Sequence, residues 1–482
     1  MSDSSLKNKT FNGMKWGLLD NLANSGITFL VGLVLARILS PTEFGILGII
    51  IIFINLSVVI IDGGFATALI RKPDATQDDY NTVFYVNVLV SVVLIALLCL
   101  GADAIAVFFC QPLLSSVLPA MSIILLFNAG SLIQKTILVK RLDFKSQACV
   151  SLVSSVVSGV LGIASAYKGL GVWALAVQQI SRQFFMMVGL WIANHWLPAL
   201  RFSIQSFKEL FGFGAKLLAA NVINSLYKDM FLAVIGKMYT ARDLGYYNRA
   251  DQFNMIFSNN FGQIVQKVSL SSLSQVQDNA ERLRSAYRKL MRYIGMFAFA
   301  AVFGLAAIAK PLIVTLIGEK WLPSVYLLQI MSLYAAIYPL QQLNLNILNV
   351  KKRSDRFLKL EIIKKFLFIP VIAVGFFFEL QFMIWAAVVY YYIEFFINGW
   401  YSYSLTGYGT WQQVKDLCPM YVVSVVVSLI VWCLTLTSLP YLPMFLLQMV
   451  VAILLYVVIY AIIGLPEYRE IKEICLNRIR RR

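Results

Sequence analysis

The stretch NLANSGITFLVGLVLARILSPTEFG, residues 21–45, occurs a second time as NVINSLYKDMFLAVIGKMYTARDLG, residues 221–245, without a gap. The polar positions of the two copies keep their chemistry. They pair as Asn21 with Asn221, Asn24 with Asn224, Ser25 with Ser225, Arg37 with Lys237, Ser40 with Thr240, Glu43 with Asp243, and Gly45 with Gly245. The sequence therefore predicts a fold built by internal duplication.

The first polar residues of each copy share one helix face. Positions i, i+3 and i+4 of a helix lie on the same side, so Asn21 and Asn24, like Asn221 and Asn224, form a polar face within an apolar helix. Such amides either line a cavity or join helices by hydrogen bonds. Because the face is present in both copies, a shared cavity is the favoured interpretation.

The composition is that of a polytopic membrane protein. The chain is 59% hydrophobic and 13% charged, with a mean hydropathy of +0.75, which a soluble globule with a polar exterior does not have. The only histidine, His195, leaves no basis for a catalytic triad or a multi-histidine metal site. The six cysteines show no metal-ligand spacing. The sequence thus indicates no enzyme and no cofactor, and leaves a coupling ion, Na⁺ or H⁺, open.

Apolar runs of about 20 residues, the length that crosses a bilayer, predict an all-α fold with about fourteen transmembrane helices. They lie at about 14–36, 43–62, 82–100, 112–139, 145–166, 170–193, 210–236, 246–270, 286–308, 322–349, 356–378, 381–404, 416–437 and 441–463. An even number of spans places both termini on one side of the membrane.

The basic residues indicate which side that is. About 30 of the 41 lysines and arginines fall in connections and tails on the side of the termini, and about 7 on the other side, which by the positive-inside rule makes that side cytoplasmic. The net charge of +17 is spread over short clusters between spans. It therefore predicts topology rather than a nucleic-acid partner. The tail, residues 466–482, is either an amphipathic helix on the inner leaflet, in contact with membrane lipids, or a solvated end.

The repeat defines the predicted domains. Beyond the first stretch the offset becomes 212, which pairs Lys140 with Lys352 and Trp173 with Trp385. Six spans in each copy insert the same way up, as two parallel lobes with a site between them. The expected domains are residues 1–205, residues 206–405, and an addition of two helices and a basic tail at 406–482.

Several segments resemble bacterial polysaccharide flippases of the Wzx type, including colanic-acid-type exporters. They are Leu35-Ala36-Arg37-Ile38-Leu39-Ser40-Pro41-Thr42-Glu43-Phe44-Gly45, Asp62-Gly63-Gly64, Ala68-Leu69-Ile70-Arg71-Lys72, Gly318-Glu319-Lys320-Trp321 and Lys364-Lys365-Phe366-Leu367-Phe368-Ile369-Pro370. The resemblance covers essentially the whole chain and places it in the multidrug/oligosaccharidyl-lipid/polysaccharide superfamily. It implies two six-helix lobes around a central cavity.

The same resemblance implies a function and a location. The substrate is expected to be an undecaprenyl-pyrophosphate-linked oligosaccharide, moved from the cytoplasmic to the periplasmic leaflet of the bacterial inner membrane for exopolysaccharide, capsule or O-antigen synthesis. A polysaccharide polymerase and export machinery are the implied partners. The identity of the sugar does not follow from it.

A pyrophosphate needs fixed positive charge, and a basic residue in mid-span costs about 2.5 to 3.5 kcal/mol on insertion scales, so it usually has a function or a partner. Arg182 and Lys228 are the deepest candidates. Lys216 and Lys135 lie nearer the inner ends of their spans, where snorkelling to the interface also explains them. Asp229 follows Lys228 and is able to neutralise it locally.

Two further candidates lie in the twelfth span. Tyr391 is a candidate to stack on a sugar ring. Glu394 falls on Arg182 in the repeat, so that equivalent depths of the two lobes carry opposite charges. The two residues either face one cavity, with Glu394 as a gate or a proton or cation site, or each has its own partner within its lobe.

Two alternative functions differ in class. A cation-coupled exporter of small organic cations would carry acids in its cavity without deep basic residues. A membrane enzyme acting on lipid-linked sugars usually needs a large extramembrane loop with paired catalytic groups, whereas every outer connection here is about 20 residues at most.

One local structure is also predicted. Ser40-Pro41-Thr42-Glu43 and Thr240-Ala241-Arg242-Asp243 each have a capping residue followed three positions later by an acid. This pattern predicts that a helix begins at each place after a tight turn.

Overall fold

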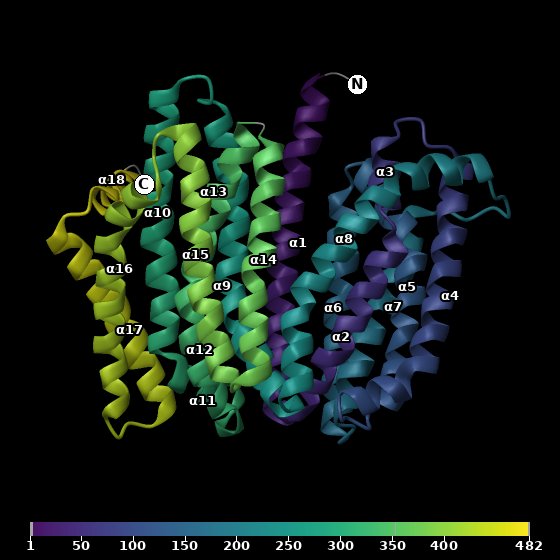
Figure 1. Ribbon diagram of the computed structural model, residues 1–482, viewed down its shortest axis with the longest axis horizontal. Helices are drawn as coiled ribbons and strands as arrows, with labels where there is room; N and C mark the ends of the chain where they lie inside the picture. Colours follow the sequence, from purple (N-terminus) through teal and green to yellow (C-terminus); the bar gives the residue numbers. More distant parts are fainter. Residues whose placement is uncertain (1–2, 352, 481–482) are drawn as a thin grey trace. The chain divides into compact units, whose positions relative to one another are not determined.

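The computed structural model describes residues 3–351 and 353–480, and within these ranges every regular element is a helix (Figure 1). The helices of the first part of the chain are α1 (Asp3–Ile38), α2 (Pro41–Asp62), α3 (Phe65–Arg71), α4 (Gln77–Phe108), α5 (Leu114–Lys140), α6 (Phe144–Tyr167), α7 (Val172–Asn194) and α8 (Ile204–Met238). Those of the second part are α9 (Ala241–Ser274), α10 (Ala280–Ala307), α11 (Ala309–Ile317), α12 (Leu322–Ala335), α13 (Tyr338–Val350), α14 (Ser354–Phe377), α15 (Leu380–Thr406), α16 (Thr410–Cys433), α17 (Tyr441–Ile463) and α18 (Pro466–Arg480). Two short 3₁₀ helices, η1 (Glu319–Trp321) and η2 (Leu434–Leu436), join neighbouring helices.

The chain forms two compact units, and the boundary along the sequence falls between Gly245 and Tyr246. In the first unit α4, α5, α7, α6 and α1 pack in that order, each against the next, and α8 packs against α2, α3 and α4. Buried apolar side chains of α3, α4, α5 and α8 form one core cluster at the end where α3 lies. This unit contains α8, the first helix of the second sequence repeat. The lobe boundary at residue 205 stays a prediction.

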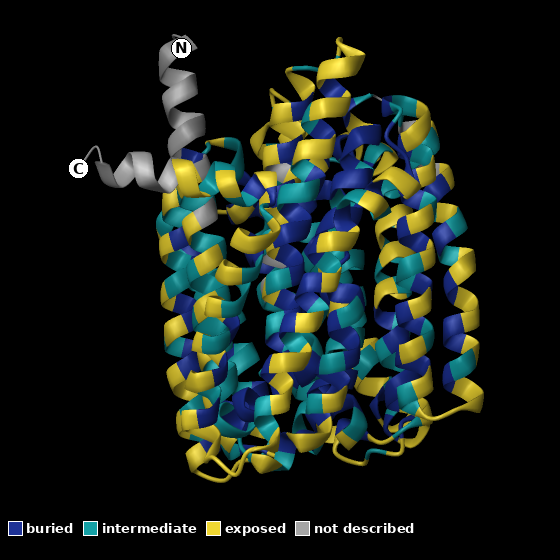
Figure 2. Ribbon diagram, turned by 90° about the vertical axis from the view of Figure 1, so that its left-hand side faces the viewer, coloured by how far each residue is buried: buried dark blue, intermediate teal, exposed yellow. Residues whose placement is uncertain are grey.

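The second unit is centred on α15, which packs against α12, α13, α14 and α16. Helix α16 also packs against α10 and α17. Figure 2, in which this unit faces the viewer, shows exposed and buried residues alternating along the helices. Such stripes are expected of helices that present one side to lipid and the other to neighbouring helices.

The protein is a multi-pass membrane protein. Among the described residues, eleven helical segments are long and apolar enough to cross a membrane. The other three predicted spans lie on α7, α9 and α14, which have 23, 34 and 24 residues and carry more polar side chains. The count of fourteen spans therefore stays a prediction for those three helices.

The predicted span at 322–349 is confirmed as the candidate span Pro323–Val350, but its helix has a break that the sequence analysis did not predict. Helix α12 ends at Ala335 and α13 begins at Tyr338, with Pro339 in its first turn. Proline has no N–H to donate and restricts the residue before it, so a helix stops or kinks at this place.

The predicted caps are confirmed in both copies. The backbone N–H of Ser40 donates to Glu43 Oε2 over 2.5 Å. The backbone N–H of Thr240 donates to Asp243 Oδ2 over 3.1 Å, and the N–H of Asp243 returns a bond to Thr240 Oγ1. These reciprocal bonds satisfy backbone donors that the first turn of a helix leaves free.

The starts of α2 and α9 touch through their glycines. A Cβ on Gly45 would lie 1.6 Å from the carbonyl oxygen of Ala241, and one on Gly245 would lie 1.9 Å from that of Pro41. All four residues belong to the first unit. Only glycine permits so close an approach of two backbones.

A second contact is repeated at the end of α5 and of α13. The ammonium group of Lys140 donates to the carbonyl of Lys72, and that of Lys351 donates to the carbonyl of Gln277 over 2.7 Å. The offset of 212 pairs Lys140 with Lys352. In this contact, however, the place of Lys140 is taken by Lys351, one position earlier.

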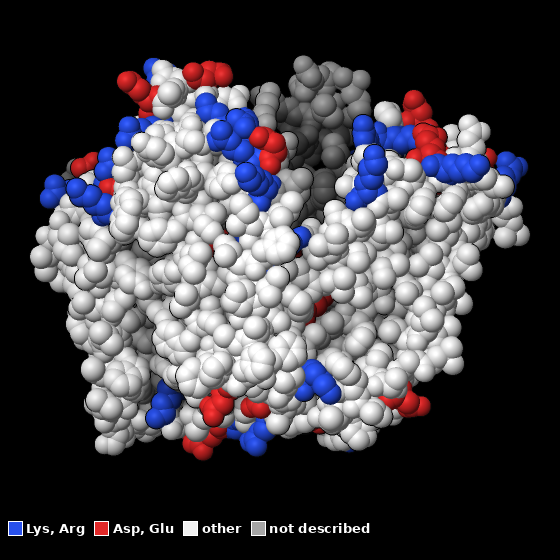
Figure 3. Space-filling model, in the orientation of Figure 1, with Lys and Arg blue, Asp and Glu red and all other residues white. Residues whose placement is uncertain are grey.

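Charged side chains gather toward the ends of the helices in each unit, with a mostly uncharged band between them on the face shown in Figure 3. In the first unit, one end of the bundle carries the Arg71–Lys72 and Lys140–Arg141 connections. In the second unit, the end where α10 begins also carries α18. The tail is helical, one of the two forms left open by the sequence. It is held by ion pairs of Lys289 with Glu470 (2.8 Å) and of Arg292 with Glu467 (2.6 Å).

Candidate functional site

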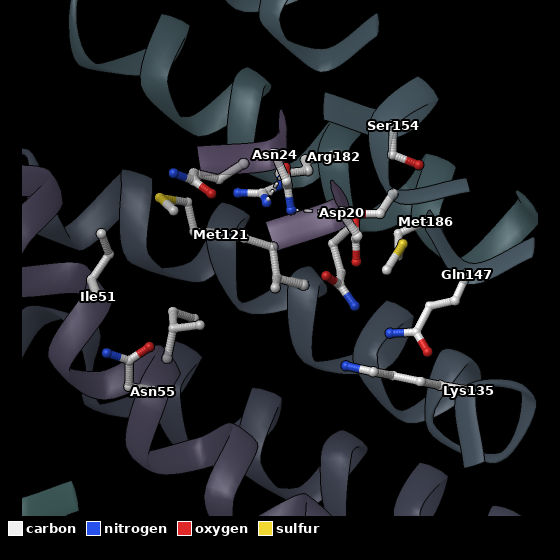
Figure 4. Close-up of a pocket in the computed structure, with 15 residues that line it drawn as sticks. Asp20, Asn24, Ile51, Asn55, Met121, Lys135, Gln147, Ser154, Arg182 and Met186 are labelled. Carbon is white, nitrogen blue, oxygen red and sulfur yellow. Dashed lines mark hydrogen bonds between the residues drawn. The ribbon is translucent and has the colours of Figure 1, made fainter. Parts of the chain in front are cut away.

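A polar cavity of about 410 Å³ lies inside the first unit, among α1, α2, α5, α6 and α7 (Figure 4). Its wall combines charged and amide side chains with apolar ones. The polar lining residues are Asp20, Asn24, Asn55, Lys135, Gln147, Ser151, Ser154, Gln179, Arg182 and Gln183. It reaches the middle of α2 and α7, and we call it the upper cavity as a name only, since α3, which Figure 1 draws at the top, lies nearer the second cavity described below.

Arg182 is the cationic centre of the upper cavity. Its Nη2 donates to Asn24 Oδ1 over 3.1 Å, and Figure 4 shows the two side chains meeting, with Asp20 beside them. Asn24 also donates to Ser151 Oγ over 3.1 Å and accepts from Ser155 Oγ over 2.5 Å. Asn24 therefore joins α1 to α6 and at the same time orients the guanidinium group of α7.

Two oxygen atoms of the upper cavity lack a partner among the described residues. They are Asp20 Oδ1 and Gln147 Oε1, and both are buried. A buried acceptor left without a hydrogen bond costs about 1 to 3 kcal/mol. A guest that brings hydroxyl or N–H donors would satisfy both.

A second cavity of similar volume, about 410 Å³, extends from the first toward the end where α3 lies. The two share Lys135, Gln183 and Met186, and the second adds Asp62 and Asn221. Lys135 lies close enough to Asp62 to act on its charge. We call this space the lower cavity. The two cavities are therefore neighbours, with Lys135 and Gln183 in the wall of both.

The second unit carries a different arrangement at Glu394, the residue that the sequence repeat pairs with Arg182. Glu394 on α15 pairs with Lys364 on α14 over 3.1 Å, so it has a partner within its own unit. The ring of Tyr391 stacks on that of Tyr334, with 4.6 Å between the centroids.

Comparisons with known proteins give the family. A family model described as "Polysaccharide biosynthesis protein" matches residues 34–326, which is more than half of the chain. This chain belongs to that family. It is thus a membrane transporter of polysaccharide biosynthesis, of the Wzx type and the superfamily that the sequence motifs indicate, and that resemblance is confirmed.

Curated relatives agree with this assignment. The chain is 25% identical over 377 residues to the lipopolysaccharide biosynthesis protein WzxC of Escherichia coli, covering 77% of this chain and 76% of the relative. It is 25% identical to the teichuronic acid biosynthesis protein TuaB of Bacillus subtilis, with 73% of each chain covered.

Solved structures show the same fold. The lipid II flippase MurJ in an inward closed conformation superposes with a TM-score of 0.75 at 16% identity, over 94% of this chain and 99% of that one. An inward-facing multidrug resistance MATE transporter gives a TM-score of 0.58 at 12% identity, over 81% and 95% of the two chains. At these identities the likeness shows the fold alone.

The structure of this family member brings four of the predicted site residues to the cavities. Arg182 and Asn24 line the upper cavity, Lys135 lines both, and Asn221 lines the lower one. Asn24 lines a cavity of the first unit and also joins helices, while a cavity shared by the asparagines of both copies stays a prediction.

The other candidates lie elsewhere. Neither Asn21 nor Asn224 lines these two cavities. Lys216 and Lys228 are exposed side chains of α8. Asp229 is buried on α8, where Ser225 donates to it over 3.3 Å, and it also interacts with Asn55 of the upper cavity.

Sequence reasoning missed several residues of the site. Asp20 stands four positions before Asn24, on the same helix face, and this spacing was the available signal. Gln147, Gln179 and Gln183 are ordinary amides whose convergence depends on how α6 and α7 pack. Lys364 lies in a segment noted for its family resemblance, yet nothing in the sequence pairs it with Glu394.

Proposed function

We propose that this protein transfers an undecaprenyl-pyrophosphate-linked oligosaccharide from the cytoplasmic to the periplasmic leaflet of the bacterial inner membrane. The observation that carries the proposal is the guanidinium group of Arg182, held in a polar cavity among α1, α2, α5, α6 and α7. Arginine pairs well with phosphate because its planar donors bind two oxygens at once.

The rest of the wall suits a sugar chain. Amide and hydroxyl groups are the neutral donors and acceptors that a glycan needs, and Asp20 and Gln147 each offer a buried oxygen without a partner among the described residues. Lys135 supplies a second positive charge on the way to the lower cavity. The names of WzxC, TuaB and MurJ support a role in envelope polymer synthesis.

Alternating access of two repeat lobes, residues 1–205 and 206–405, completes the proposal and rests on the sequence duplication. Both termini then lie in the cytoplasm, where the clusters of basic residues belong by the positive-inside rule. A polymerase on the periplasmic side would use the product. The glycan itself is left unspecified.

The test is polymer export in cells of the source bacterium that carry only a variant copy of the gene. Arg182→Gln should lower surface polymer at least tenfold and cause lipid-linked repeat units to accumulate on the cytoplasmic side. Arg182→Lys should retain part of the activity, since a point charge still attracts phosphate but loses bidentate binding.

The matched control is Lys168→Gln, which removes an exposed charge in the connection between α6 and α7. It should export polymer at the normal rate. Normal export by Arg182→Gln, at equal protein level, would contradict the proposal.

Export of small organic cations is a second candidate, because two acids, Asp20 and Asp62, line the cavities. Efflux of ethidium from cells that express the protein discriminates between the two. A drug exporter would lose efflux in Asp20→Asn, whereas a flippase would show no efflux above cells without the gene.

A further inference from the structure

The connection between α7 and α8 exposes apolar side chains at the end of the first unit where α3 lies. Leu197 is 69% exposed, Leu200 94% and Phe202 55%, and Ile204, the first residue of α8, is 64% exposed. Apolar side chains that are exposed as a group, rather than singly, mark a surface that binds a protein or a membrane. We call Leu197, Leu200, Phe202 and Ile204 the apolar rim.

The polar backbone of the same connection is bonded inward. The backbone N–H of Ala199 donates to Asn81 Oδ1 over 3.0 Å, and that of Ser203 donates to Thr82 Oγ1 over 3.0 Å. Both acceptors belong to α4 and are 0% exposed. A connection in water has the opposite arrangement, with its polar groups in the solvent and its apolar side chains against the protein.

Trp196 fixes the connection in this position. Its indole N–H donates to Gln77 Oε1 over 2.9 Å, and its carbonyl accepts from Gln134 Nε2 over 2.9 Å. Its ring packs against Tyr80 and Phe84, with 6.4 and 5.9 Å between the centroids. The connection is therefore anchored to α4 and α5, and the exposure of the apolar rim is a property of the folded chain.

The charge around the apolar rim is positive. From the start of the connection to Lys208 the chain carries two cations, Arg201 and Lys208, both exposed, and no acid. Arg71 of α3 lies 4.7 Å from the centre of an aromatic ring of α8 and adds a third exposed cation. Glu209, the next residue along the chain, pairs with Lys72 over 3.0 Å. The surface is thus basic as well as apolar.

We infer that the apolar rim inserts into the cytoplasmic leaflet of the membrane, where Arg201 and Lys208 bind the headgroups of anionic phospholipids. Apolar side chains next to exposed cations are the combination that holds a segment in the interface of an anionic membrane. Each basic residue near such a surface strengthens binding roughly fivefold. The inference rests on the proposed orientation, which places this end in the cytoplasm, and is independent of the substrate.

The position of the apolar rim in the chain gives the contact a consequence. Helix α7 ends the first sequence repeat and α8 begins the second. A connection held in the leaflet sets the depth at which the second repeat begins, and anionic lipid strengthens that hold.

The test is fluorescence quenching of the full chain in lipid nanodiscs. A bimane label is placed on a cysteine at position 200, in a background without the native cysteines. Phospholipids with brominated acyl chains should quench it, whereas iodide in the water should not. The matched control is a label in place of Asp74, an exposed residue between α3 and α4 at the same end, which iodide should quench.

The headgroup is tested by brominating only phosphatidylglycerol or only phosphatidylcholine in the same lipid mixture. Brominated phosphatidylglycerol should quench several-fold more strongly. The double variant Arg201→Gln, Lys208→Gln should quench equally with both lipids, while Lys168→Gln, an exposed cation between α6 and α7, should keep the preference.

Quenching at position 200 by iodide would place the apolar rim in water, and protection from both quenchers would place it against protein. Either result would overturn the inference. Equal quenching by the two lipids in the parent protein would overturn the assignment of the headgroup. Polymer export by Arg182→Gln tests the flippase on its own, so each proposal is able to fail without the other.

Discussion

At the scale of single residues, the contact between the starts of α2 and α9 leaves no room for one methyl group. Gly45→Ala would bring a Cβ to 1.6 Å from the Ala241 carbonyl oxygen, and the strain should destabilise the protein by about 3 kcal/mol, the upper end of the usual cost of overpacking. Thermal unfolding of the purified variant in detergent measures this.

The matched control is Gly26→Ala in α1, where an added Cβ meets nothing within 4 Å. It should change the stability by about 1 kcal/mol or less. Equal melting temperatures for Gly45→Ala and the parent protein would show that the two helix starts separate easily.

The two asparagine copies make a second prediction at this scale. Asn24 lines the upper cavity and Asn224 is exposed on α8, so cysteines placed at either position should react with a water-soluble thiol reagent. A cysteine at Ala174, which is buried in α7, should not react. All three belong in a background without the native cysteines. Complete protection at 24 and 224 in every transport state would leave helix joining as their only role.

The residues of the site were predictable only in part. A basic residue in the middle of an apolar span is visible in a sequence, and Arg182 was found in this way. The partners of Arg182 and Glu394 could not be predicted, because they lie on other helices. The packing of α1 near α6 and α7, and of α14 on α15, leaves no pattern in the local sequence. Lys228 had the same signal as Arg182, yet it lies on an exposed face of α8.

At the scale of elements, α18 is held to α10 by two ion pairs of unequal burial. Glu467 is buried and contacts Arg292, whereas Glu470 and Lys289 are both about half exposed. Glu467→Gln should weaken docking of α18 by about 1 to 3 kcal/mol, and faster amide exchange in 466–473 would measure it. Glu470→Gln, the exposed counterpart, should leave exchange close to that of the parent protein.

The pH dependence of this docking has a definite sign. Lys289 donates to Glu470 and holds the pKa of that carboxyl below its usual value of 4.5. A lowered pKa in the folded state gives stabilisation that is present above pH 4.5 and is lost as the pH falls through the lower value. Because Glu470 is exposed, exchange in α18 should rise only slightly as the pH falls below about 4, and by no more than the small change caused by Glu470→Gln. A rise that occurs at neutral pH would contradict this assignment.

Elements were the most predictable level. Long apolar runs and the caps at Ser40 and Thr240 located the long helices of the described chain, because span length and local hydrogen bonds depend on nearby sequence. Several helices extend beyond the apolar run, since α1 begins at Asp3 rather than at 14 and α4 ends at Phe108 rather than at 100. The break between α12 and α13 was missed, since Pro339 stands in an apolar run that reads as continuous.

At the scale of the whole molecule, topology is the testable property. With the termini inside, a cysteine in place of Asp74, between α3 and α4, lies in the cytoplasm, and one in place of Lys168, between α6 and α7, lies in the periplasm. A membrane-impermeant thiol reagent should label the second in intact cells and the first only after the cells are broken. Labelling in the opposite order would reverse the proposed orientation.

The arrangement of the repeats was predictable only as far as the duplication itself. Matching residues such as Gly45 and Gly245 show that the chain contains two copies, but the contacts of α8 with α2, α3 and α4 depend on tertiary packing that no periodicity records. For the same reason the lobe boundaries stay predictions.

The reciprocal contact of the two glycines bears on the origin of the chain. Gly45 contacts the first residue of α9, and Gly245 contacts the first residue of α2. Equivalent residues of the two copies therefore contact each other reciprocally, as at the interface of a two-fold symmetric dimer. An ancestor with a single copy of the repeat would bury this glycine by pairing with a second identical subunit. Gene fusion would then turn a symmetric interface into an internal one, after which either half was free to change its charges, as Arg182 and Glu394 have done, while the glycines had to be kept in both.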